Sequence, residues 1–239
     1  MFKADKHLLT TLLSLAQEQL IKMERFGSIY ADEAIIGHSN EGDFVTFAAD
    51  EHSEALKDRI IAVQVPYNLR VGEEIKIYQK MMQDSKVMGV HLAPLTLRTA
   101  STVAVLSRLD SPSRQGMTLL DKLRLYDGQM VSPYTRHDLA EMQRHNLDEG
   151  MQGLSPRYVM NRIGAVASKP DIICVSPLAS LDSLWQGMKE NVSLDQNDLA
   201  KYVVLVVDAV KEYNAFVIKE LQKAYDESFE QSANDLLRS

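Results

Sequence analysis

The chain has 239 residues, of which 45% are hydrophobic and 25% are charged, a composition typical of a folded globular protein. Its 26 basic and 33 acidic residues give a net charge of -7 without any block of like charge, so we expect neither nucleic acid nor another polyanion as its main partner. The longest apolar run, residues 202–207, is far shorter than the ~20 residues that a membrane-spanning helix needs, so no membrane partner is expected.

The first part of the chain predicts one helix and two strands. Residues 7–20 carry leucine at helical spacing, which predicts an amphipathic helix packed on a larger body. Two short apolar runs follow at 34–37 and 60–65, and their β-branched residues predict buried strands of a parallel sheet. Two parallel strands do not form a stable sheet alone, so this part is expected to belong to a larger α/β domain.

From residue 72 onward the pattern is helical. Glu73 and Glu74 suit the first turn of one helix, where the helix dipole favours carboxylates. Pro94 opens a second predicted helix that runs to residue 109, and residues 109–116 carry a loop signal. Residues 132–146 are expected to be partly helical and exposed.

A long amphipathic helix is predicted near the end of the chain. Its apolar residues recur every three or four positions, so that they share one face and predict a core or inter-domain surface. They are Val203, Val206, Val210, Tyr213, Val217, Leu221 and Ala224. The mixed charges of the opposite face disfavour a membrane role.

The single cysteine, Cys174, lies in an apolar run and has no second cysteine with which to form an internal disulfide. We interpret it as a buried thiol in a reducing compartment. The first residues do not lead into the apolar segment of a signal peptide. Together these features predict a soluble, cytoplasmic protein.

Several stretches of the chain carry a specific family pattern. They are residues 34–41, 54–60, 65–78, 123–128, 148–157, 211–213 and 220–225. Together they closely resemble serine protein kinases of the PrkA family, a family that is similar to the wider AAA+ class of ATP-driven modules. The resemblance covers most of the chain and is weakest at 19–33 and 129–147.

The resemblance implies a fold and a domain order. The expected fold is an α/β remnant of an AAA+ core, followed by a mostly α-helical lid and a C-terminal helical region. Residues 1–68 would form the rear half of the core, residues 69–169 the lid, and residues 170–239 the start of the C-terminal region. ATP and Mg²⁺ are the implied cofactors of the intact protein, and the implied substrate is a protein.

Two site residues are implied in the first of these parts. Asn40, which follows the run at 34–37, resembles the first sensor, whose amide holds the attacking water or a phosphate oxygen. Arg59 resembles the arginine finger that reaches a neighbouring subunit's nucleotide, which implies a homo-oligomer. The alternatives are a turn residue for Asn40 and a surface ion pair with Asp58 or Glu54 for Arg59.

A third site residue is implied in the lid. Arg157 resembles the second sensor, an arginine at the start of a lid helix that closes over the phosphates of its own subunit. Ser155 is predicted to cap this helix and Pro156 to occupy its first position. The alternative is an exposed arginine at an ordinary helix start.

The motifs that hold phosphate and metal are missing from the sequence. No glycine is followed by lysine, so the phosphate-binding pattern G-x-x-x-x-G-K-[ST] is absent, and neither predicted strand, at 34–37 or 60–65, ends in an Asp-Glu pair. Residues 136–139 and 126–128 only superficially resemble the H-R-D-L and D-F-G motifs of eukaryotic kinases. We therefore expect a truncated reading frame, an expressed fragment or a broken gene.

Three functions remain open at this point. The intact protein is either a serine protein kinase or an ATPase that remodels a protein partner, and the sequence does not separate the two. The third possibility is that these residues form a non-catalytic helical piece that binds another protein. The isolated chain is expected to be inactive in any of these cases.

Overall fold

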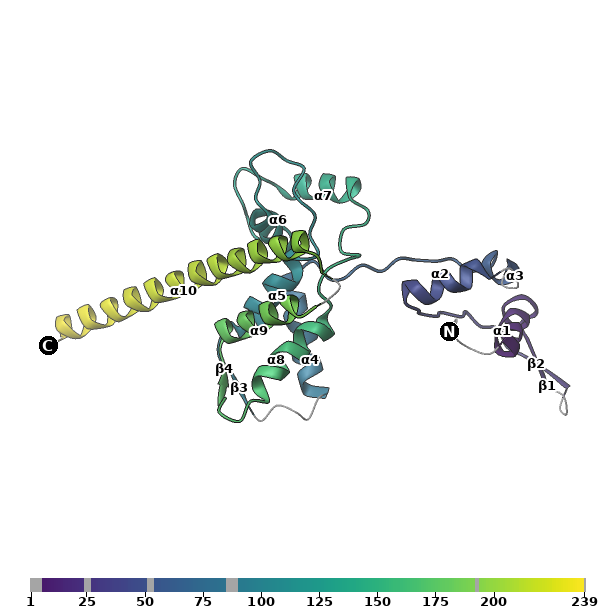
Figure 1. Cartoon of the computed structure of the whole chain (residues 1–239). Helices are drawn as coiled ribbons and strands as arrows, with labels where there is room; N and C mark the ends of the chain where they lie inside the picture. Colours follow the sequence, from purple (N-terminus) through teal and green to yellow (C-terminus); the bar gives the residue numbers. More distant parts are fainter. Residues whose placement is uncertain (1–5, 24–26, 51–53, 85–89, 192–193, 239) are drawn as a thin grey trace. The chain divides into compact units, whose positions relative to one another are not determined.

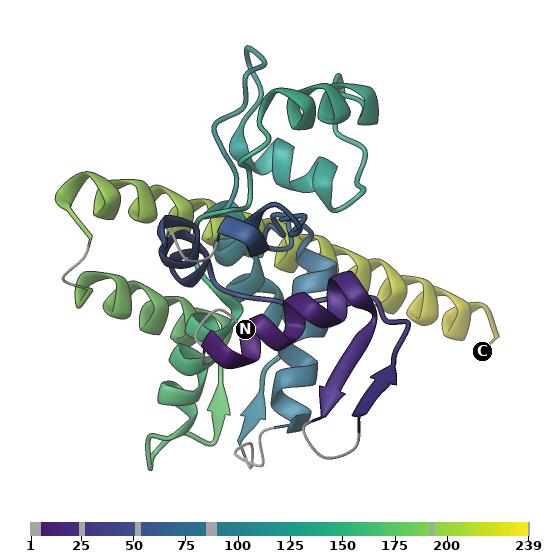
Figure 2. The same ribbon diagram turned by 90° about the vertical axis from the view of Figure 1, so that its right-hand side faces the viewer.

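A computed structural model describes residues 6–23, 27–50, 54–84, 90–191 and 194–238. The chain divides into two compact units, residues 1–64 and residues 65–239 (Figures 1 and 2). Most of the described residues are helical, and the two sheets have two strands each. No helix among the described residues is long and apolar enough to cross a bilayer.

Unit 1, residues 1–64, contains one helix followed by an antiparallel pair of strands and two short helices. Its elements are α1 (Lys6–Glu18), β1 (Leu20–Met23), β2 (Gly27–Tyr30), α2 (Glu41–Ala49) and α3 (Glu54–Lys57). The predicted helix at 7–20 is thereby confirmed as α1. Strands β1 and β2 pair antiparallel, with Leu20 opposite Tyr30 and Met23 opposite Gly27.

The two strands predicted at 34–37 and 60–65 are wrong. The structure gives both runs an irregular backbone and leaves their apolar side chains in solvent, with Ile36 95%, Ile61 90% and Val65 82% exposed. A β-strand is stable only beside a partner strand that shares its hydrogen bonds. Among the described residues neither run has such a partner, so its β-branched side chains alone do not form a strand.

Unit 2, residues 65–239, is a helical bundle with one small parallel sheet. Its helices are α4 (Val71–Asp84), α5 (Thr96–Leu106), α6 (Leu119–Tyr126), α7 (Arg136–His145), α8 (Pro156–Ala167), α9 (Pro177–Lys189) and α10 (Gln196–Arg238). Strand β3 (His91–Leu92) pairs parallel with β4 (Cys174–Val175). The helices predicted from residue 72, from Pro94 and within 132–146 are confirmed as α4, α5 and α7. Cys174 is only half-buried.

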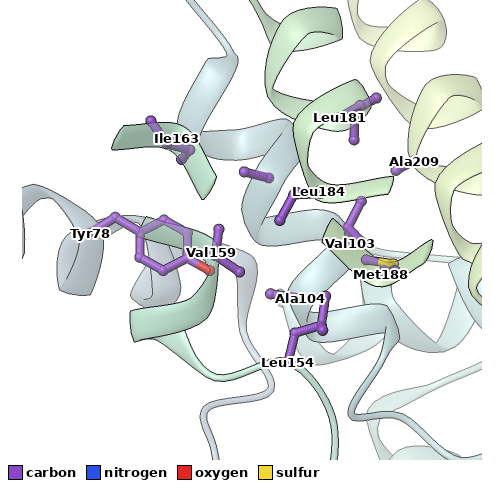
Figure 3. Packing of buried hydrophobic residues seen from close by; sticks show 11 residues of the cluster. Tyr78, Val103, Ala104, Leu154, Val159, Ile163, Leu181, Leu184, Met188 and Ala209 are labelled. Atoms are coloured by element: carbon purple, nitrogen blue, oxygen red, sulfur yellow. The ribbon is translucent and has the colours of Figure 1, made fainter. Parts of the chain in front are cut away.

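Helix α5 lies at the centre of unit 2 and contacts α4, α6, α8, α9 and α10. Its small side chains Ala100, Val103 and Ala104 are fully buried, so the neighbouring helices approach its backbone closely. Figure 3 shows residues of the surrounding helices converging on it, among them Leu184. Burying one leucine completely contributes roughly 1.5–3 kcal/mol, so the fully buried side chains of this cluster stabilise the unit substantially.

The helix predicted from the stripe between Val203 and Ala224 is confirmed as part of α10, which is longer than that stripe, and the prediction of its buried face is only partly correct. Val206 and Val210 pack against the central cluster, as does Tyr202, which was not on the predicted stripe. Val203 and Leu221, both on that stripe, are 42% and 64% exposed. The contacts made by α5 and α9 on the first half of α10 decide which side is buried.

Candidate functional site

Helix α8 begins as the sequence predicts. Ser155 is its N-cap, with an extended backbone (φ -75, ψ 151), and its Oγ accepts a hydrogen bond from the backbone N of Tyr158 at 3.2 Å. Pro156 occupies the first helical position. Arg157 follows in the first turn and is exposed, so its guanidinium lies in solvent near the positive end of the helix dipole.

A buried ion pair fixes the loop that leads into α8. Arg108, just after α5, donates to Glu74 of α4 through Nη2 at 2.6 Å and Nη1 at 2.8 Å, and both side chains are inaccessible to solvent. Nε and Nη2 also donate to the carbonyl of Leu154, at 3.0 and 2.8 Å. A further bond from Nη1 to the carbonyl of Asn68, at 2.8 Å, completes the five donors of the guanidinium. The Cζ atom of Arg108 lies over the Tyr67 ring, 4.9 Å from the ring centre.

Two glycines let this loop approach the end of α5. Gly153 has φ +108, and a Cβ added there would lie 2.6 Å from the carbonyl oxygen of Ser107. Gly150 has φ +88, and its Cβ would lie 3.1–3.2 Å from atoms of residues 66–69. Tyr67 N donates to the Gly150 carbonyl at 2.8 Å. The glycines are therefore required by close backbone contact as well as by the left-handed conformation.

A second buried network lies beside the first. Lys122 of α6 forms an ion pair with Glu149, and their side chains are 1% and 2% exposed. The other carboxylate oxygen of Glu149 accepts from the Tyr126 hydroxyl. Lys122 Nζ also donates to the carbonyl of Asp110 at 3.0 Å, and Asp110 N donates to Glu149 at 2.9 Å. Burial, followed by the bond to Glu149, raises the pKa of Tyr126 above its usual value.

Asp127 and Arg124, which lie in another family-like stretch, form hydrogen bonds to other helices of unit 2. Asp127 accepts a hydrogen bond from Gly72 N, at the start of α4, at 2.9 Å. Arg124 donates to Glu212 of α10 through Nη2 at 2.5 Å and Nε at 3.1 Å. These bonds join α6 to α4 and to α10, so the family-like stretches 65–78, 123–128 and 211–213 are linked within unit 2.

The residues that resemble eukaryotic kinase motifs have capping roles. Asp138, in the stretch 136–139, forms a capping box with Thr135 at the start of α7. The hydrogen bonds from the Thr135 backbone and side chain lower the pKa of its carboxyl group. Asp138 therefore stabilises a helix end and is held as a carboxylate by that role.

Asn40 lies at the start of α2 and does not follow a strand. It is the N-cap of that helix, exposed, and its Oδ1 accepts from Asp43 N at 2.9 Å. The amide NH₂ group is the part of this side chain that would donate to a phosphate or to water. Its role as a sensor stays a prediction.

Arg59 is exposed and lies just after α3. With the Gln17 amide oriented so that its oxygen faces the guanidinium, this oxygen accepts from Arg59 Nε at 2.7 Å. To act on a neighbouring subunit, Arg59 would have to leave Gln17 of α1. Asn40 and Arg59 belong to unit 1 and Arg157 to unit 2, and their convergence on one triphosphate remains a prediction.

The buried pairs of Arg108 with Glu74 and of Lys122 with Glu149 are not predicted from the sequence, where Glu74 is expected only as a carboxylate at a helix start. The available signal was Arg108, a basic residue two positions after the apolar residues that end α5, where burial would require an anionic partner. The partner itself is 34 residues away in the sequence, and local patterns do not identify it. Within the described ranges no group of three or more His, Cys, Asp or Glu side chains is arranged to hold a metal ion.

Comparison with known proteins covers almost the whole chain. The family profile described as PrkA AAA domain matches residues 1–116, and the profile described as PrkA serine protein kinase C-terminal domain matches residues 120–239. A Bacillus subtilis (strain 168) protein named ATP-dependent protease PrkA is 42% identical over 237 residues. An Escherichia coli (strain K12) protein named serine/threonine kinase YeaG is 31% identical over 241 residues.

These relatives are much longer than the chain. The matches include 99% of this chain but only 38% of the Bacillus protein and 37% of the Escherichia protein. No solved structure matches the chain significantly. The similarity therefore applies to a defined part of each relative.

Proposed function

The chain belongs to the PrkA family, and on that basis we propose that the intact protein binds ATP and Mg²⁺ and phosphorylates serine on a protein substrate. Residues 1–68 are then a remnant of the AAA+ core, residues 69–169 its helical lid, and residues 170–239 the start of the C-terminal helical region. The relative named serine/threonine kinase YeaG supports the kinase reaction. The location of such a protein would be the cytoplasm, where ATP is available.

The main support for ATP binding is the geometry around Arg157 at the start of α8. An exposed guanidinium in the first turn of a helix suits a phosphate, because planar donors and the positive helix end both favour the negative charge. The loop behind it is fixed by Arg108, so Arg157 is presented by a rigid backbone. This chain's contribution is thus to hold and sense the phosphates, while ATP and Mg²⁺ supply the phosphoryl group and its charge neutralisation.

Asn40 and Arg59 are assigned to the same nucleotide chemistry. We assign the amide of Asn40 to the attacking group or the γ-phosphate, and the guanidinium of Arg59 to the nucleotide of a neighbouring subunit in a homo-oligomer. The phosphate-binding loop would lie outside these 239 residues, because no glycine here is followed by lysine.

The test compares phosphate transfer with phosphate release in the full-length protein. ATP labelled at the γ-phosphate should place its label on serine of an added protein, and Arg157→Ala should lower this rate about 100-fold. Arg136→Ala is the matched control, because Arg136 is also an exposed arginine in the first turn of a helix, α7. Equal rates for the two variants would contradict the role of Arg157.

The second candidate is ATP hydrolysis coupled to work on a protein partner. The 42% identical relative is named an ATP-dependent protease, which favours an ATP-driven action on proteins without phosphate transfer. In the same assay this function releases all label as free phosphate, and Arg157→Ala slows that release. The label on serine therefore decides between the two functions.

The non-catalytic alternative concerns the isolated chain. Calorimetry with ATP should give no binding heat for the 239 residues, because the phosphate-binding loop is absent from them. Tight binding of ATP would contradict our placement of the phosphate site. If the full-length protein also fails to bind ATP, the result supports the alternative that these residues form a non-catalytic helical segment that binds another protein.

A further inference from the structure

The second half of α10 presents an apolar stripe to solvent. Every side chain from residue 218 to residue 229 is exposed, including Ile218 at 55%, Leu221 at 64%, Tyr225 at 73% and Phe229 at 66%. These four residues are spaced three, four and four positions apart, so they follow one face of the helix. Figure 1 shows this half of α10 extending beyond the other helices of unit 2. An exposed apolar stripe of this kind is typical of an interaction surface.

The two flanks of the stripe differ in charge. At 100° per residue, Lys219 and Asp226 lie on one flank, seven residues apart, and both are exposed. The other flank carries the uncharged residues Val217, Ala224 and Ser228. One flank therefore holds both signs of charge, and the other holds none.

This asymmetry selects a partner and an orientation. In an antiparallel pair of identical helices the like flanks face each other, so Lys219 of one copy meets Asp226 of the other, twice by symmetry. In a parallel pair the charged flank would face the uncharged flank, and neither charge would be paired. The charge pattern is thus complementary to a second copy of the same helix running in the opposite direction.

The apolar residues fit the same register. With Leu221 opposite Tyr225 of the second copy, Ile218 lies within one residue of the level of Phe229, and Lys219 lies within one residue of the level of Asp226. A shallow depression between Leu221, Gln222, Tyr225 and Asp226 can receive an apolar side chain of the opposite helix.

We infer that α10 forms an antiparallel homodimer through Ile218, Leu221, Tyr225 and Phe229, with Lys219 and Asp226 pairing across the interface. The contact is independent of the nucleotide chemistry proposed above and of any interface at Arg59. The segment is only ~18 Å long, so a dissociation constant in the micromolar range, about 1–100 µM, is expected.

Sedimentation equilibrium of the 239-residue chain tests the dimer. The average mass should rise with concentration from 26.9 kDa toward twice that value. The double variant Leu221→Glu, Tyr225→Glu should stay monomeric, because it places four carboxylates in the interface, whereas Arg59→Ala should dimerise like the original chain. Because both side chains are exposed, the double variant should keep α10 helical, and circular dichroism checks this. A chain that stays monomeric at ~100 µM, or a double variant that still dimerises, overturns the proposal.

Charge reversal tests the orientation. Lys219→Glu should weaken the dimer about tenfold, since each copy then opposes Asp226 with a like charge, and adding Asp226→Lys should restore it. Lys223→Glu is the matched control, because Lys223 carries the same charge, is also exposed, and lies about 40° farther round the helix from the apolar stripe than Lys219. Equal effects of Lys219→Glu and Lys223→Glu, or no recovery in the double reversal, overturn the antiparallel arrangement.

Discussion

Arg108 and Lys122 are buried cations that each hold a carboxylate and a backbone carbonyl. Arg108 binds Glu74 and two carbonyls, and Lys122 binds Glu149 and the carbonyl of Asp110. A buried charge without its partner is very costly, so each cation and its carboxylate stabilise the fold only as a pair. Their common effect is to attach residues 149–154, which lead to Arg157, to α4, α5 and α6.

Arg108→Met should lower the free energy of unfolding by about 3–5 kcal/mol, because it leaves the Glu74 carboxylate and two carbonyls buried without a donor. Chemical denaturation measures this change. Arg114→Met is the control: Arg114 pairs with Asp138 and Glu141 at the surface, and its loss should cost at most about 1 kcal/mol. Adding Glu74→Met to Arg108→Met should recover stability; a further loss would contradict the pairing.

The raised pKa of Tyr126 predicts a loss of stability in alkali. Because the folded protein keeps this proton above pH ~10, where the unfolded chain releases it, the free energy of unfolding falls as pH rises through that range. Tyr126→Phe should reduce the slope by up to ~1.4 kcal/mol per pH unit, although it loses the bond to Glu149 at neutral pH. Melting curves between pH 8 and pH 11 check this, and an unchanged slope would show that Tyr126 does not titrate differently on unfolding.

At the scale of elements, α8 is positioned by what precedes it. Its cap and first turn are local, but the loop before it is held by backbone contact with the end of α5 at Gly153. Leu154 N donates to Ser107 Oγ at 2.9 Å, which adds a bond at the same place. The direction in which Arg157 points therefore depends on α5 as well as on α8.

Gly153→Ala should destabilise the chain by about 2–4 kcal/mol, because the new methyl group would meet the Ser107 carbonyl at 2.6 Å in a backbone conformation that alanine disfavours. Thermal unfolding measures the change. Gly164→Ala is the matched control, since a Cβ there meets nothing within 4 Å inside α8 and should stabilise the helix by about 0.5–1 kcal/mol. Similar effects of the two variants would contradict the close contact at Gly153.

At the scale of the whole molecule, the chain consists of two units with different packing. Unit 2 has a continuous buried cluster, whereas Phe47 is the buried apolar residue of unit 1 among those described. The irregular residues 60–65 join the two units and are mostly exposed. The first family profile ends at residue 116 and the second begins at residue 120, whereas the two compact units meet at residues 64 and 65. The profile called AAA domain therefore includes the central helix α5 of unit 2.

Limited proteolysis should separate the two units. A low amount of trypsin is expected to cut after Arg59 first, because an exposed, irregular backbone fits a protease readily, and to leave a stable fragment that begins at Ile60. Mass spectrometry identifies the fragment, and circular dichroism shows whether it remains helical. Early cuts within α5, α8 or α9 at the same rate would contradict the compactness of unit 2.

The sequence by itself determined the features that depend on neighbouring residues. Periodic leucines predicted α1, Glu73 and Glu74 indicated the start of α4, and Pro94 indicated the start of α5. Ser155 with Pro156 predicted the start of α8, because helical bonds and caps join residues a few positions apart. The seven family-like stretches of the sequence also identified the PrkA family, which the family profiles confirm. The direct site roles of Asn40, Arg59 and Arg157 remain predictions.

Only the tertiary structure decided the features that join distant residues. It paired Arg108 with Glu74 and Tyr126 with Glu149, and it left the runs at 34–37 and 60–65 without a partner strand. It also selected which face of α10 is buried. The reason is physical: a buried charge, a strand and a helix face each acquire their state from a partner far away in the sequence, and the local pattern shows only that a partner is needed.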